Sequence, residues 1–79
     1  LRLRYRDELK TMVATVIKQA MTRNAALAFI AQWAGEHVVS SDVEMVRAMA
    51  EAELLNLHEG NFARYRVRPS EFQRWREVW

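Results

Sequence analysis

The chain has 79 residues, a net charge of +2, 51% hydrophobic residues and no cysteine. This length predicts a single domain over residues 1–79 and excludes a large core, because a chain of this size buries only about 60% of its surface. Without cysteine there is no disulfide and no cysteine-based zinc site, which fits a cytoplasmic protein. The longest apolar stretch, AALAFIA, is too short to span a membrane, which takes about 20 residues.

Charge is distributed unevenly along the chain. Residues 1–23 carry six basic and two acidic residues, residues 24–59 carry one basic and six acidic residues, and residues 60–79 carry five basic and two acidic residues. We expect the basic ends to fold over the acidic middle, or to meet the acidic middle of a second copy. The alternative is that the basic ends bind nucleic acid.

The first predicted helix begins near the N-terminus. Apolar residues between positions 9 and 21 recur at three- and four-residue intervals, which is the spacing of one helix face. Tyr5 continues this face, and Arg4 and Glu8 are one helical turn apart, so we expect the opening LRLRYR to be helical as well. The alternative is that Asp7 caps the helix and leaves the first six residues as an arm.

A second helix is expected after Asn24, a poor helix former and a good cap, although one long helix through both segments is the alternative. The run AALAFIAQWA is apolar on almost every side, and Gly35 is expected to cap its end. A helix of this kind is either buried or shared with another subunit. This pattern makes Phe29, Ile30 and Trp33 candidate partner-binding residues.

The segment HVVSSD is predicted to be a short extended connector before a third helix. Ser41 and Glu44 have the spacing of a capping box, in which each side chain bonds a backbone amide at the start of the helix. We expect this helix over residues 42–59, with its apolar side chains, including Met49, facing inward and its acids facing outward. Gly60 is the expected residue after its C-terminus.

Pro69 disfavours a helical conformation at Arg68, so ARYRVR (residues 63–68) is expected to be extended or irregular. A short last helix should follow, with Phe72 and Trp75 on its apolar side. The predicted fold class is therefore all-α, a small bundle of three or four helices with a short extended connector before the last helix.

No residue pattern indicates catalysis, a cofactor or a metal. A helical metal site would place a glutamate three residues before His37 or His58, but Ala34 and Leu55 stand there. We expect both histidines to lie near helix C-termini, where they interact with the last carbonyls. The serines of the connector are explained as caps, and two glycines are too few for a phosphate loop. The sequence therefore favours a protein that is not an enzyme.

The stretch AGEHVVSSDVEMVRA (residues 34–48) resembles the loop and last helix of a histone-type fold. It is also similar to the small helical C-terminal domain of the B subunit of light-independent protochlorophyllide reductase, in which a basic helix and a turn precede an I/V-T-x-E/D-x-V helix. The matching residues here are VSSDV (residues 39–43). The proline and paired arginines usual in that family's first helix are missing, and only Lys18 and Arg23 remain. The resemblance covers about half of the chain and implies no catalytic residue.

These patterns predict a non-enzymatic interaction module, an accessory subunit that docks on a larger complex or on its own copy. An extended ARYRVR would present its arginines in a row to carboxylates of a partner, or to the acids of a second copy. The competing hypothesis is a nucleic-acid-binding regulator that uses the arginines and aromatic residues of the C-terminal part. The candidate partner-binding residues are Phe29, Ile30, Trp33, Arg64, Tyr65, Arg66, Arg68 and Trp75.

Overall fold

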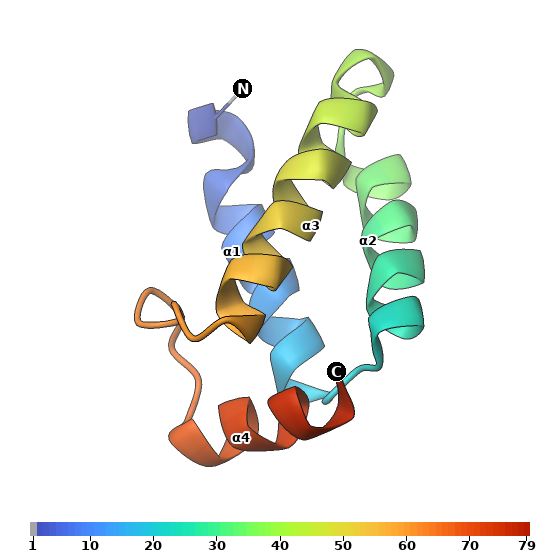
Figure 1. Ribbon diagram of the computed structural model, residues 1–79. Coiled ribbons are helices and arrows are strands. Elements are labelled where there is room, and N and C mark those ends of the chain that lie inside the picture. Colours follow the sequence, from blue (N-terminus) through green and yellow to red (C-terminus); the bar gives the residue numbers. More distant parts are fainter. Residues whose placement is uncertain (1) are drawn as a thin grey trace.

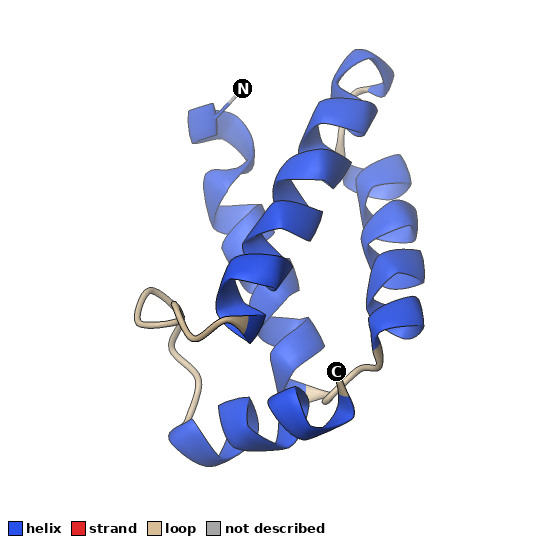
Figure 2. Ribbon diagram, in the orientation of Figure 1, coloured by secondary structure: helices blue, strands red, loops and turns tan. Residues whose placement is uncertain are grey.

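The computed structural model describes residues 2–79, and it describes side chains from residue 5 onward. Its elements are α1 (Arg2–Lys18), α2 (Arg23–His37), a 3-10 turn (Ser40–Asp42), α3 (Val43–His58) and α4 (Pro69–Val78). Figure 1 shows α1, α2 and α3 packed as a bundle, with α4 lying across the end at which α1 finishes. The described part of the chain contains helices, the 3-10 turn and loops but no strand (Figure 2), which confirms the predicted all-α fold class.

The opening motif LRLRYR is helical from its second residue, because α1 begins at Arg2. This confirms the prediction of a helix rather than an arm that starts after a cap at Asp7. Tyr5 is buried on the same face as Met12 and Val16, and its phenol oxygen accepts a hydrogen bond of 3.2 Å from the backbone amide of Val39. The predicted pairing of Arg4 with Glu8 falls on a side chain outside the described residues.

The end of α1 is a Schellman motif without glycine. The amide of Ala20 donates to the carbonyl of Ile17 (3.0 Å), and the amide of Met21 donates to the carbonyl of Val16 (3.2 Å). Ala20 has a φ of 49°, in the left-handed region that glycine adopts more easily. The break between the first two helices therefore exists as predicted, but it lies a few residues before Asn24.

The ends of α2 differ from those predicted. The cap is Thr22, whose hydroxyl oxygen accepts a hydrogen bond of 3.3 Å from the amide of Ala25, while Asn24 lies inside the helix. Gly35 does not end the helix, because α2 continues to His37 and is followed by Val38 in an extended conformation. The prediction of a cap at Gly35 is wrong.

The predicted capping box at Ser41 and Glu44 does not form. The 3-10 turn over Ser40–Asp42 precedes α3, and no side chain caps either element. Asp42, the residue before α3, has φ −105° and ψ −7°, whereas a capping residue is normally extended so that its side chain can reach back to the first amides. Only Val38 and Val39 of the connector are extended.

Both predictions around the last connection are confirmed. Gly60 follows α3 with a φ of 108°, and the amides of Gly60 and Asn61 donate to the carbonyls of Leu57 and Asn56 in a second Schellman motif. Residues 61–68 form an irregular loop, and Arg68 is extended before Pro69 opens α4 at a position that suits proline.

One hydrophobic core joins all four helices. Trp75 of α4 has no exposed surface and belongs to the same core as Ile17 of α1, Ile30 of α2 and Leu54 of α3. The apolar face that the periodicity predicted for α1 is buried, and no polar or charged residue among those described is buried with it. The helix at the C-terminus therefore completes the core at one end of the bundle.

The left-handed residue at the end of α1 leads to a stability prediction. Ala20→Gly should raise the free energy of unfolding by roughly 0.5–1 kcal/mol, because glycine adopts a positive φ without the steric cost of a Cβ atom. The measurement is chemical denaturation followed by circular dichroism.

Ala28→Gly is the matched control, since Ala28 is exposed inside α2 and glycine there should lower stability by about 1 kcal/mol. Equal destabilisation by both substitutions would show that Ala20 is not left-handed in solution.

Candidate functional site

Most of the aromatic and aliphatic residues predicted to bind a partner lie inside the protein. Ile30, Tyr65 and Trp75 are buried in the core, and Trp33 is only 9% exposed. Their apolar character is accounted for by the chain's own folding, and in the single chain they form no exposed surface. Their binding of a partner stays a prediction. Phe29 is half-buried and lines a shallow apolar groove of about 440 Å³ between α1 and α2.

The arginines of the loop do not stand in a row. Residues 63–65 form a turn and a bend, and the amide of Tyr65 donates to the carbonyl of Phe62 (3.3 Å). Arg64 donates through Nη1 to Oε2 of Glu53 at 3.0 Å, so one pairing expected with a second copy forms within a single chain. Arg66 and Arg68 are exposed.

Tyr65 is held beside this ion pair. Burial raises the pKa of its phenol well above the usual value, and the negative charge of Glu53 raises it further, while the positive charge of Arg64 acts in the opposite direction. Tyr65 therefore stays protonated in the folded protein over a wide pH range. It acts as a core residue that positions the loop, and its ring face is not available for stacking on a ligand.

A surface that the sequence prediction missed lies on the outer side of α3. Met45 is 55% exposed, Met49 is 39% exposed and Leu55 is 43% exposed. Ala48 and Ala52 between them are also exposed, which makes an apolar stripe at three- and four-residue spacing. We call these five residues the α3 face. Met49 was predicted to face inward and does not, because Val46 and Ala50 occupy the buried side.

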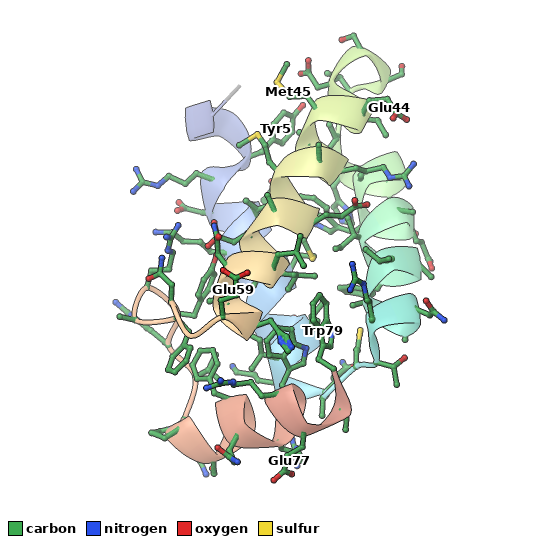
Figure 3. The ribbon with its side chains drawn as sticks, in the orientation of Figure 1. Tyr5, Glu44, Met45, Glu59, Glu77 and Trp79 are labelled. Atoms are coloured by element: carbon green, nitrogen blue, oxygen red, sulfur yellow. The ribbon has the colours of Figure 1, made fainter. Side chains whose placement is uncertain are left out.

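Acidic residues border the α3 face. Glu44 and Glu51 lie two turns apart along one edge, and Glu59 follows the end of the helix. Figure 3 shows the side chains of Met45 and Glu44 on different sides of the first turn of α3. Glu59 lies at the opposite end of the helix. Arg47 reaches Glu44 at 3.8 Å and compensates part of this charge. The α3 face is therefore an apolar strip within an acidic frame.

Basic residues gather on another part of the molecule. An open trough of about 620 Å³ lies between α1 and the loop, and its lining brings residues of the first helix beside residues of ARYRVR. The lining residues are Asp7, Lys10, Thr11, Ala14, Thr15, Lys18, Arg64, Tyr65 and Arg66. The trough contains two of the predicted partner-binding arginines, Arg64 and Arg66.

The histidines take the positions that the sequence predicted. His37 and His58 are in the last turns of α2 and α3, and Nδ1 of His37 lies 3.1 Å from the carbonyl oxygen of Trp33. Within residues 2–79, His, Asp and Glu side chains form no group of three that could hold a metal ion. None of the helices in this part of the chain combines the length and the apolar character that a membrane crossing requires.

Comparisons with known proteins assign neither a family nor a function to this chain. No family model matches the chain, and no curated protein or solved structure shows significant similarity to it.

The raised pKa of Tyr65 predicts a stability difference at alkaline pH. The unfolded chain releases the phenol proton near pH 10, whereas the folded chain retains it. The contribution of Tyr65 to the free energy of unfolding is therefore complete below pH 10 and is lost as the pH rises further. The difference in free energy of unfolding between Tyr65→Phe and wild type should shift in favour of the variant by about 1 kcal/mol per pH unit above pH 10.

All other titrating groups are shared by the two chains, so the difference between their denaturation midpoints isolates Tyr65. A difference that stays constant from pH 8 to pH 11 would contradict the raised pKa.

Proposed function

We propose that this protein is a non-enzymatic interaction module that docks on a larger complex through the α3 face. The observation that carries this proposal is the exposure of Met45, Met49 and Leu55 on a helix whose other side is fully buried. Large apolar side chains aligned on one exposed face are typical of protein interaction sites. A cytoplasmic location is part of the proposal, in keeping with the lack of cysteine.

The composition of the α3 face suits another helix. Ala48 and Ala52 lie in its middle and leave room for a second helix to approach closely, while the longer side chains stand on both sides of them. Methionine has three rotatable bonds and a polarisable sulfur, so Met45 and Met49 can adapt to the shape of the partner. An amphipathic helix that lays its apolar side on this face would follow a common mode of recognition.

The acidic frame favours a foreign helix over a second copy. In an antiparallel pair of α3 helices related by a two-fold axis, the edge with Glu44 and Glu51 would face the same edge of the other copy. In a parallel pair, that edge would face the edge that carries Glu53, whose charge Arg64 already compensates. Opposed like charges therefore disfavour the antiparallel arrangement, whereas a partner helix with basic edges would be attracted to Glu44 and Glu51 in either orientation. We therefore propose a partner helix with lysine or arginine along its edges.

The test is isothermal titration calorimetry with a synthetic amphipathic helix that has leucine on one face and lysine along both edges. Leu55→Gln should weaken its binding by about tenfold, because burial of a partly exposed leucine contributes on the order of 1–1.5 kcal/mol. Val78→Gln is the matched control, since Val78 of α4 is 41% exposed and Leu55 is 43% exposed. It should change the affinity by less than about twofold.

The same peptide with glutamate along its edges should bind more weakly than the lysine form. Equal affinity for the two peptides, or equal loss in the two variants, would overturn the assignment of the α3 face. Sedimentation that shows a stable dimer whose formation Leu55→Gln abolishes would identify the occupant as a second copy and contradict the choice of a foreign helix.

A further inference from the structure

Among the side chains that the structure describes, the basic ends of the chain leave most of their charge without an ion pair. Among the side chains of residues 5–79, the only ion pair between a basic end and the acidic middle is Arg64 with Glu53. The second ion pair in this part of the protein, Arg47 with Glu44, lies within α3. The expectation that the basic ends fold over the acidic middle is thus met at one contact, and the other described cations of the two ends have no carboxylate partner.

Part of this charge converges on the trough between α1 and the loop. Lys10 and Lys18 come from α1 and are separated by eight residues, or about 12 Å along the helix axis. Arg66 comes from the loop, and Arg64 beside it is already paired with Glu53. The cations therefore form an elongated row that two distant parts of the sequence share.

The rest of the lining defines the ends and floor of this row. Thr11 and Thr15, whose hydroxyls donate to backbone carbonyls one turn earlier, form an uncharged floor together with Ala14. Asp7 places a negative charge toward the N-terminal end of α1. At the Lys18 end, Nη2 of Arg74 donates to the carbonyl of Lys18 at 2.7 Å and brings a further cation. The positive charge is therefore strongest from the middle of the trough to the Lys18 end.

We propose that this trough binds the phosphodiester backbone of a nucleic acid without reading its bases. The one aromatic residue in the lining, Tyr65, is buried and offers no ring face to a base. The trough therefore offers its contacts to phosphates, which differs from binding through an arginine and aromatic cluster. It is also independent of the α3 face, with which the trough shares no residue.

The physics of association favours a phosphate chain over an acidic peptide. Each exposed pair of a lysine or arginine with a carboxylate contributes under about 1 kcal/mol, and this trough offers no apolar pocket to anchor a peptide side chain. A nucleic acid carries condensed counterions, and their release supplies free energy for every phosphate that a cation neutralises. A few exposed cations can therefore hold a nucleic acid where they would hold a peptide poorly.

The test is fluorescence anisotropy of the whole chain with a labelled single-stranded oligonucleotide and, in a second arm, its duplex, over a series of salt concentrations. The double variant Lys18→Gln/Arg66→Gln removes two lining cations. It should lower the affinity for the single strand by about 25-fold at 0.1 M salt and reduce the steepness of the log–log salt dependence by about 1.4. Binding of either the single strand or the duplex supports the proposal, and comparing the two affinities shows which one the trough prefers.

The matched control is Arg68→Gln/Arg76→Gln, which removes the same charge from two exposed residues that do not line the trough. It should lower the affinity only a few-fold, and both variants should keep the helical circular dichroism of wild type. Equal losses in the two variants, or no measurable binding at low salt, would overturn the proposal. A polyglutamate peptide and an unlabelled oligonucleotide of equal charge are then compared as competitors. If the peptide competes as strongly as the oligonucleotide, the trough does not prefer phosphates to carboxylates, and the proposed ligand is wrong.

Discussion

The burial of Trp75 is the interaction on which the rest of this structure depends. Its side chain has no exposed surface, and it belongs to the same core as Ile17 and Leu57 near the ends of α1 and α3. Removing a buried tryptophan typically costs about 3–5 kcal/mol, which is a large part of the 5–15 kcal/mol that stabilises a small domain. Because Trp75 holds α4 across the bundle, the loop over residues 61–68 must return alongside α1. The contact of Arg64 with Glu53 and the basic trough both follow from this path.

A chain of this length can build one core, and α3 shows the consequence most clearly. Val46, Ala50, Leu54 and Leu57 fill the inner side of α3, so nothing in the described chain remains to cover the methionines and the leucine on its outer side. Acidic residues frame this outer side, while basic residues line the trough beside α1. The molecule therefore presents an apolar surface and a cationic surface on different elements.

The sequence predicted features whose physical cause is local. The helical opening followed from the apolar face that Tyr5 continues, and the end of α3 followed from Gly60, which accepts a positive φ. Ala20 adopts the same kind of conformation without glycine, so nothing in its identity marked the end of α1. Features that depend on packing were mostly missed, because a helix with apolar residues on both sides does not reveal which side is buried. Met49 was expected inside and is exposed, whereas Trp75 was expected to bind a partner and is buried in the chain's own core. The neighbouring helices decide both positions.

The central claim is that the α3 face is uncovered in the isolated protein, and the four methionines provide a direct test of it. Methyl groups of ¹³C-labelled methionine can be followed by nuclear magnetic resonance while a soluble paramagnetic gadolinium chelate is added. We expect strong broadening for Met45 and Met49, which are 55% and 39% exposed, and little for Met12, which is 3% exposed. If Met45 and Met49 are protected to the same degree as Met12 in the chain alone, the α3 face is already covered and is not a free docking surface.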